Sequence, residues 1–127
     1  MDISKRVIVI EDNEDILFVI NLILEEIGYR VFKSKSADII GNLESIKPDL
    51  IVLDDKLDDI HGSEICRELK SNSATSHIPV ILISAGVDLP ATAQECFADG
   101  YLEKPFDLKE FEELLRSFDM RNCSRNA

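Results

Sequence analysis

Short runs of consecutive apolar residues recur along the chain and alternate with longer segments in which apolar residues have helical spacing. Three of these runs, Val7 to Ile10, Leu50 to Leu53 and Val80 to Ile83, contain no polar residue. A strand that is apolar throughout is buried on both faces, which is typical of a parallel sheet covered by helices. Arg30 to Lys33 and Tyr101 to Leu102 are two further strand candidates.

The segments between these runs carry the spacing and the end signals of helices. The clearest one begins after Asn13, a good capping residue, and ends at Gly28. The residues that we expect to face the sheet from this helix are Ile16, Ile20, Ile23 and Ile27. The other predicted helices are Ala37 to Ile46 after Ser36, Ser63 to Leu69, Ala91 to Ala98 closed by Gly100, and Asp107 to Phe118, with Asp107 and Glu110 spaced as in a capping box.

Five strands that alternate with five helices predict an α/β fold with a doubly wound parallel sheet and right-handed crossovers. The length of 127 residues suits one domain, which we place at residues 1–120. Residues 121–127 are expected to form a short polar tail that frays. In such sheets ligands bind at the carboxyl ends of the strands, so the residues that follow each strand are the candidates for function.

The formal net charge of −11 narrows the range of functions. An acidic chain lacks the basic face that nucleic acids and anionic membranes require, so we expect neither as a direct partner. Its carboxylates could instead gather a divalent cation. The chain has three cysteines, Cys66, Cys96 and Cys123. An odd number of cysteines without a C-x-x-C pair favours buried or idle thiols in a reducing compartment. The N-terminal apolar run is too short for a signal peptide or a membrane span, and we therefore expect a cytoplasmic protein.

Polar residues with a distinctive chemistry follow four of the predicted strands. They are Glu11 and Asp12 after the first strand, Asp54 after the third, Ser84 after the fourth and Lys104 after the fifth. Because clustered carboxylates repel one another, Mg²⁺ would stabilise them. Asp54 could then act as a nucleophile that forms an aspartyl phosphate. Lys104 would supply a second positive charge and Ser84 a hydrogen bond to the phosphoryl group.

Each of these residues also has a purely structural interpretation. Asp12 could be a helix cap, Lys104 a solvent-facing lysine, and Ser84 a strand-end hydroxyl that bonds the local backbone. The combination of acids, hydroxyl and lysine on neighbouring strand ends is what favours a phosphoryl-transfer site.

The segments VIVIEDNEDI, PDLIVLDDKLDDIHG, HIPVILISA and GYLEKPF resemble the response-regulator receiver family of two-component signalling. The resemblance extends from about Lys5 to Phe118 and is similar to the single-domain, chemotaxis-regulator-like members. It implies a flavodoxin-like sheet with strand order 2-1-3-4-5. It also implies a switch that takes a phosphoryl group from the phosphohistidine of a histidine kinase or a histidine phosphotransfer protein, in a Mg²⁺-dependent reaction, and then changes conformation to signal downstream.

The same resemblance implies a role for each matching acidic residue. Glu11 and Asp12 match the acidic pair that binds Mg²⁺. Asp54 matches the phosphoacceptor, which is also a metal ligand. Lys56, two positions later, would give its backbone carbonyl to the metal.

The remaining matches concern the switch. Ser84 matches the hydroxyl that follows the phosphoryl group, Tyr101 the aromatic switch position, and Lys104 the lysine that pairs with the phosphoryl group. The Lys104–Pro105 bond is similar to one that is usually cis in the family.

The loop after the acceptor departs from the family pattern. Leu57–Asp58 stands where a Met-Pro pair is common, and His61 stands where an acid commonly precedes the loop glycine, Gly62. We expect these changes to alter the shape of the loop and not the chemistry, and the Asp55–Lys56 pair to tune the lifetime of the phosphate. His61 is more simply a solvated loop residue than a pH sensor.

Two other functions remain as alternatives. A haloacid-dehalogenase-type phosphatase would need a D-x-D-x-T motif, whereas Asp12 is followed by Asn13, Glu14 and Asp15, and the chain lacks room for a cap domain. A non-phosphorylated receiver-like adaptor that only binds a partner usually loses part of the acid, hydroxyl and lysine set, all of which is present here. We therefore expect a signalling switch that catalyses only its own phosphoryl transfer and dephosphorylation, and not an enzyme acting on other substrates.

The first helix carries more apolar residues than one core-facing stripe requires. Phe18 and Leu22 lie four residues apart on another side of it. They could dock the helices of a histidine kinase or phosphotransfer protein, or they could be buried under the last helix.

Overall fold

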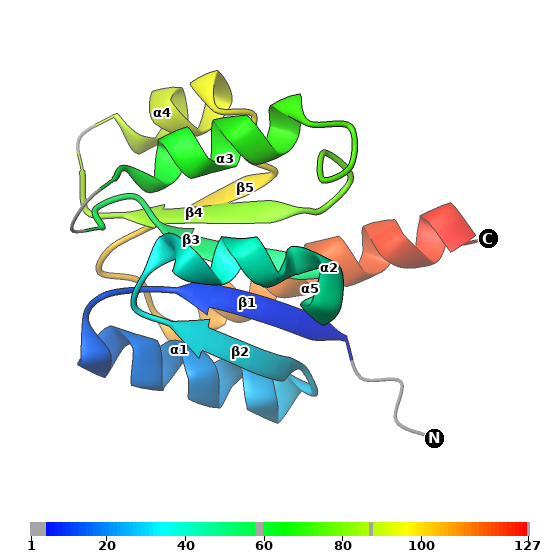
Figure 1. Ribbon diagram of the computed structural model, residues 1–127. Helices are drawn as coiled ribbons and strands as arrows, with labels where there is room; N and C mark the ends of the chain where they lie inside the picture. Colours follow the sequence, from blue (N-terminus) through cyan, green and yellow to red (C-terminus); the bar gives the residue numbers. More distant parts are fainter. Residues whose placement is uncertain (1–4, 58–59, 87, 127) are drawn as a thin grey trace.

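The computed structural model describes residues 5–57, 60–86 and 88–126, without the side chains that follow Phe118. Its five strands form one parallel sheet in the order β2-β1-β3-β4-β5, which confirms the predicted architecture (Figure 1). The strands are β1 (Arg6–Ile10), β2 (Arg30–Ser34), β3 (Leu50–Asp54), β4 (Val80–Ser84) and β5 (Gly100–Glu103). β3 and β4 are each one residue longer than predicted, so Asp54 and Ser84 are the last residues of their strands.

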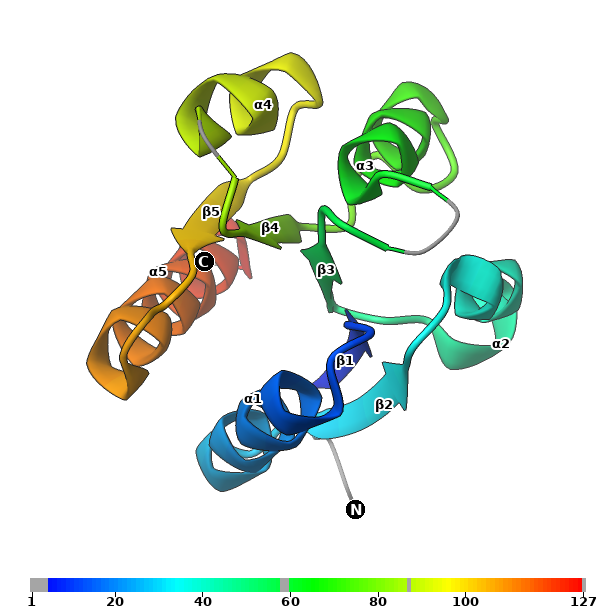
Figure 2. The same cartoon turned by 90° about the vertical axis from the view of Figure 1, so that its left-hand side faces the viewer.

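Helices cover both faces of the sheet (Figures 1 and 2). One face carries α1 (Glu14–Ile27) and α5 (Leu108–Asn126), and the other carries the 3₁₀ helix η1 (Ala37–Asn42), α2 (Leu43–Ile46), α3 (Gly62–Ser71) and α4 (Leu89–Glu95). The sheet has a hydrophobic core on each face. Successive side chains of a strand point to opposite faces, so they pack alternately into one core and the other. Val7 and Val9 pack with α1 and α5, whereas Ile8 and Ile10 pack on the other side.

The ends of α1 are the ones that the sequence predicts. The Asn13 side chain accepts a hydrogen bond from the Ile16 backbone N–H, and Gly28 ends the helix with a φ of 116°. That conformation suits glycine, which has no Cβ to clash.

The buried face of α1 differs in part from the predicted one. Its buried residues are Leu17, Ile20, Ile23 and Leu24. Ile16 is half-buried and packs against the same core, as predicted, whereas Ile27 is exposed, so the predicted stripe was wrong at its last residue. Leu17 and Leu24 lie seven residues apart, about two turns of a helix with 3.6 residues per turn, so they share one side of the buried face.

Phe18 and Leu22 are 60% and 50% exposed, so α5 does not bury them. The open alternative of burial under the last helix is therefore excluded, and these two side chains form an exposed apolar strip with Val19.

The predicted helix at Ala37 to Ile46 is divided. Ser36 caps it as expected by accepting from the Asp38 N–H, but the first part is the 3₁₀ helix η1 and only Leu43–Ile46 is α-helical. Gly41 and Asn42 are poor formers of α-helix, which accounts for the division.

The helix predicted at Ala91 to Ala98 lies two to three residues earlier, at Leu89–Glu95, with Pro90 in its first turn. Proline is well suited to that position because its missing N–H has no partner there. The helix ends at Glu95, shortly before Phe97, which takes a φ of 62°, so Gly100 begins β5 and does not close α4.

Helix α5 is longer than predicted. Asp107 precedes it and accepts from the Glu110 N–H, as the capping pattern implies. The helix continues to Asn126, residue 127 lies outside the described residues, and the expected fraying of the tail after Met120 stays a prediction. No glycine or proline interrupts the sequence from Leu108 to Asn126, and each further helical residue adds a backbone hydrogen bond.

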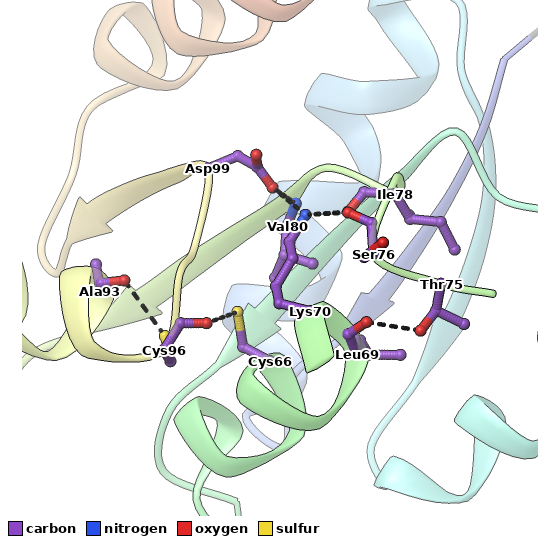
Figure 3. Close-up of polar contacts among 10 residues, drawn as sticks. All are labelled: Cys66, Leu69, Lys70, Thr75, Ser76, Ile78, Val80, Ala93, Cys96 and Asp99. Carbon is purple, nitrogen blue, oxygen red and sulfur yellow. Dashed lines mark hydrogen bonds and ion pairs between the residues drawn. The ribbon is translucent and has the colours of Figure 1, made fainter. Parts of the chain in front are cut away.

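Two contacts of Lys70 tie α3 to the segments that lead into β4 and β5, at the amino ends of these strands (Figure 3). The Lys70 ammonium lies 2.6 Å from Asp99 Oδ2 and donates to the Ile78 carbonyl at 2.6 Å. Asp99 Oδ2 also accepts from the Val80 N–H at 2.8 Å, so this pair fixes the amino end of β4.

Cys66 and Cys96 are free, buried thiols, as the sequence predicts, and they lie side by side in the core (Figure 3). Cys66 Sγ donates to the Cys96 carbonyl at 3.3 Å. Burial, together with the neighbouring Cys96, raises the pKa of the Cys66 thiol. A thiol that stays protonated is a weak nucleophile, so the pair contributes to packing. The side chain of Cys123 lies outside the described part of the chain.

Candidate functional site

The carboxyl ends of the strands meet at one rim of the sheet, which Figure 2 views end-on. Glu11 directly follows β1, Asp54 and Ser84 end β3 and β4, and Lys104 directly follows β5. The parallel topology therefore gathers on one rim the residues that the sequence placed after separate strands. The Lys104–Pro105 bond, which leads out of this rim, is cis as expected.

Three carboxylates form the centre of the rim. Glu11, Asp12 and Asp54 each offer an oxygen, and these oxygens all lie within 4.8 Å of one another. Glu11 and Asp54 are buried, with 1% and 4% of their surface exposed, whereas Asp12 is half-buried. Lys104 pairs with the two buried acids, because its ammonium lies 2.8 Å from Glu11 Oε1 and 3.4 Å from Asp54 Oδ1.

Burial raises the pKa of Glu11 from 4.5 to about 7. The Asp54 carboxylate adds to this rise, while Lys104 and the Asn13 backbone N–H, which donates to Glu11 Oε2 at 3.1 Å, limit it. Glu11 Oε1 is buried and receives no aligned hydrogen bond from the residues that the structure describes, although the ammonium of Lys104 is close. The single positive charge of Lys104 therefore does not neutralise the three carboxylates of this cluster.

These observations fit a magnesium ion. The donors are carboxylate oxygens, the hard ligands that Mg²⁺ prefers, and a buried carboxylate oxygen without an aligned donor is a position that a cation would satisfy. Asp12 is the most accessible of the three acids, which leaves one side of the cluster open to water or to a ligand.

Without divalent metal, the raised pKa of Glu11 should make the protein less stable as the pH rises. Between pH 4.5 and about 7 the folded protein keeps a proton that the unfolded chain releases, so each pH unit lowers the free energy of unfolding by up to about 1.4 kcal/mol. Glu11→Gln should remove this part of the pH dependence. Urea denaturation of both proteins in EDTA, from about pH 5 to about pH 8, measures the difference, and parallel profiles would contradict the raised pKa.

The hydroxyl and the aromatic residue of the predicted switch lie on β4 and β5. Ser84 is 2% exposed, and its Oγ accepts from the Gly86 N–H at 2.9 Å. The Lys104 N–H donates to the Ser84 carbonyl at 3.0 Å, which links the two strand ends. Tyr101 is 43% exposed, so its ring is not packed into the core.

The loop after Asp54 returns close to the strand end. The Lys56 backbone N–H donates to Asp54 Oδ1 at 3.3 Å, and Lys56 and His61 form an antiparallel bridge. His61 is exposed, as expected for a solvated loop residue. Asp58, the second residue of the departure Leu57–Asp58, lies outside the described residues.

The structure assigns roles to two residues of this loop that the sequence left open. A Cβ on Gly62 would lie 2.1 Å from the Asp54 carbonyl oxygen, so only glycine fits. Asp55 accepts a hydrogen bond from the Ser63 N–H through its carboxylate. The retained glycine was visible in the sequence, but nothing local connects Asp55 with a helix that begins seven residues later.

The doubly wound sheet with clustered carboxylates and a paired lysine on its carboxyl rim defines the class of CheY-like receiver domains. The sequence matches the family model of the response regulator receiver domain over residues 7–116, and the chain therefore belongs to that family. It is a receiver domain of the two-component response-regulator type.

Similar proteins include a transcriptional regulatory protein and a polar-differentiation response regulator. The chain is 39% identical over 126 residues to the KDP operon transcriptional regulatory protein KdpE of Escherichia coli, covering 96% of this chain and 54% of KdpE. It is 28% identical over 120 residues to the polar-differentiation response regulator DivK of Brucella ovis, covering 91% of this chain and 96% of DivK. The chain thus spans about half the length of KdpE and nearly all of DivK.

Among solved structures, the signal receiver domain of a LuxO repressor protein from Vibrio parahaemolyticus superposes with a TM-score of 0.85. It is 25% identical and the match covers 98% of this chain and 96% of that one. Within the described residues, none of the helices has the length and apolar character needed to cross a membrane.

Proposed function

We propose that this receiver takes a phosphoryl group onto Asp54 from the phosphohistidine of a histidine kinase or a histidine phosphotransfer protein. The observation that carries the proposal is the position of the Asp54 carboxylate. It is buried at the strand rim, clustered with Glu11 and Asp12, and 3.4 Å from the Lys104 ammonium. A carboxylate held beside a positive charge and next to metal-binding oxygens is suited to attack phosphorus.

Glu11, Asp12, Asp54 and the backbone carbonyl of Lys56 would hold Mg²⁺, which would supply positive charge to neutralise the oxygens of the transferred group. An Asp54 oxygen forms its bond to phosphorus as the phosphorus–nitrogen bond of the donor breaks, and the donor imidazole takes up a proton from water. The Lys104 ammonium moves away from Glu11 and pairs with the new phosphoryl oxygens. Water later hydrolyses the acyl phosphate and restores Asp54.

The switch follows from the added negative charge. A phosphoryl group on Asp54 adds strong hydrogen-bond acceptors beside β4, and the Ser84 hydroxyl turns from the Gly86 N–H to donate to one of them. The space that Ser84 leaves allows the exposed Tyr101 ring to turn inward. The outer surface next to β5 therefore differs between the two states, and downstream proteins select one of them.

The exposed strip on α1 is the surface that we assign to the phosphodonor. Phe18, Val19 and Leu22 are 60%, 42% and 50% exposed, on a helix that begins three residues after Glu11 at the phosphoryl rim. An apolar strip of this kind suits the helices of a kinase or a phosphotransfer protein.

Phe18→Ala with Leu22→Ala should slow phosphotransfer from a protein donor about tenfold or more, because both substitutions remove apolar contact from the interface. The same double variant should take phosphate from acetyl phosphate at the wild-type rate, since the rim is unchanged. Rapid-mixing assays with both donors provide the comparison. Equal rates for wild type and variant with the protein donor would remove the strip from the docking surface.

As a proposal, the protein acts in the cytoplasm, binds no nucleic acid directly and catalyses only its own phosphorylation and dephosphorylation. The net charge of −11 supports the absence of a nucleic-acid interface.

The direct test is incubation of the protein with acetyl phosphate, with Mg²⁺ or with EDTA, followed by intact-mass measurement. One base-labile phosphoryl adduct that forms only with Mg²⁺ is the expected result. An adduct that forms equally in EDTA would remove the metal from the proposal. If neither acetyl phosphate nor a phosphohistidine protein gives an adduct, the protein is a receiver-like adaptor.

A further inference from the structure

Helix α3 begins without a cap from the residue that precedes it. The first backbone N–H groups of a helix have no partner within the helix and need one from outside. His61 occupies the capping position of α3 with extended backbone angles but makes no side-chain cap hydrogen bond. Its carbonyl accepts only from the Glu64 N–H at 3.0 Å and, at a long 3.4 Å, from that of Ile65.

One residue outside the helix, Asp55, receives the first two of these N–H groups. The Gly62 N–H donates to the Asp55 carbonyl at 2.7 Å, and the Ser63 N–H donates to the Asp55 carboxylate Oδ1 at 2.9 Å. Ser63 is the second residue of α3, whose N–H a capping side chain normally takes. The negative charge of a carboxylate also suits the positive end of the helix dipole.

Asp55 is fixed to the sheet at the same time. Its own N–H donates to the Ile83 carbonyl of β4 at 2.9 Å. Asp55 therefore joins three elements: β3, which it directly follows, β4 and the start of α3.

The loop that Asp55 closes carries Lys56. Lys56 directly follows Asp55, and His61 directly precedes Gly62 and Ser63, which donate to Asp55. The antiparallel bridge between Lys56 and His61 is therefore the next pair of residues along the same loop. The backbone position of Lys56 thus depends on how firmly the start of α3 is held against Asp55. Loss of the carboxylate would leave the Ser63 N–H without this partner and free the loop to move.

We infer that Asp55 is a positioning residue, whose carboxylate caps α3 in place of His61 and thereby holds the backbone of Lys56 at the phosphoryl site. This inference rests on the proposed function, because it assigns the Lys56 carbonyl to Mg²⁺. It also accounts for an acid next to Asp54, where a second negative charge would otherwise only oppose phosphorylation.

Four variants separate the cap from the charge. Asp55→Ala removes the acceptor and the charge, whereas Asp55→Asn keeps an oxygen acceptor and removes only the charge. Asp55→Ala with His61→Asp places a new acceptor at the capping position itself. Ser36→Ala is the matched control, because it removes the cap of a different helix, η1, which is a hydrogen bond of 3.0 Å from the Asp38 N–H.

Two measurements apply to all four. Hydrogen exchange, read by mass spectrometry, follows the amides at the start of α3, and calorimetric titration with MgCl₂ gives the Mg²⁺ affinity. For Asp55→Ala we expect faster exchange at Ser63 and about three- to tenfold weaker Mg²⁺ binding. A factor of this size corresponds to a free energy similar to the one that a single helix cap contributes to stability. Asp55→Asn and the double variant should recover most of both losses, and Ser36→Ala should leave both unchanged.

The inference is overturned if Asp55→Ala exchanges and binds Mg²⁺ as the wild type does. It is also overturned if Asp55→Asn is as impaired as Asp55→Ala, since the charge and not the cap would then be responsible. A wild-type protein that binds no Mg²⁺ would overturn the proposed function itself, and the positioning role with it, a result distinct from any difference among the variants.

Discussion

Asp54→Asn should abolish the phosphoryl adduct while leaving the domain folded. The amide of asparagine is not a nucleophile, so no bond to phosphorus can form at this position. The substitution should not unfold the protein, because it removes one of two buried carboxylates that repel each other and leaves Lys104 paired with Glu11 at 2.8 Å. In EDTA at about pH 8, the free energy of unfolding should equal or exceed that of the wild type.

The matched control for this variant is Glu44→Gln. It makes the same change from acid to amide at an exposed residue of α2, outside the carboxylate cluster, and should be phosphorylated at the wild-type rate. Intact-mass measurement after incubation with acetyl phosphate and Mg²⁺ compares the three proteins. A base-labile adduct on Asp54→Asn would show that another residue is the acceptor.

Most of the site could be predicted from the sequence because its parts follow strands. Apolar runs such as Val7 to Ile10 and Leu50 to Leu53 are unambiguous strands, and parallel strands place their carboxyl ends on one rim. The order of the strands then decides which residues meet. β1 lies between β2 and β3, so Glu11 and Asp54 become neighbours although they are far apart in the chain.

The helix boundaries were less predictable, because local signals compete there. Pro90 reads as a break between elements, yet it lies in the first turn of α4. Gly100 reads as a helix end, yet it begins β5, and α4 already ends at Glu95, shortly before Phe97, whose φ of 62° no sequence rule requires. On α1, the choice between Ile27 and Leu24 as a core residue depends on how the helix packs, which the pattern alone does not determine.

The electrostatics of the site also required the fold. The sequence shows that Glu11 is acidic but not that it is 1% exposed, and its pKa rises because of that burial. The cap that Asp55 provides is likewise invisible in the sequence, since it joins a strand end to a helix start across a loop. What the sequence predicts well is which residues reach the rim, and what it misses is how each one is held there.

Gly62→Ala should be the most disruptive small substitution in the domain. Its Cβ would lie 2.1 Å from the Asp54 carbonyl oxygen, 2.9 Å from the Asp54 carbonyl carbon and 3.0 Å from the Asp55 Cα. All three are backbone atoms of the strand end that carries the acceptor, so no side-chain rotation relieves the contact. Helix α3 has to move away from β3, and we expect the free energy of unfolding to fall by about 2 to 4 kcal/mol.

Gly41→Ala makes the same chemical change where nothing lies within 4 Å of the new Cβ. Gly41 is in the 3₁₀ helix η1 and its φ is not in the left-handed region, so alanine should stabilise the protein by about 0.5 kcal/mol through the unfolded chain. Urea denaturation of the two variants and the wild type gives both differences. Because the displaced α3 would also lose its hydrogen bonds to Asp55, which hold Lys56 at the rim, Gly62→Ala should bind Mg²⁺ more weakly as well. If the two glycine variants instead proved equally stable, the close approach of α3 to Asp54, and with it the account of how this loop is held, would be wrong.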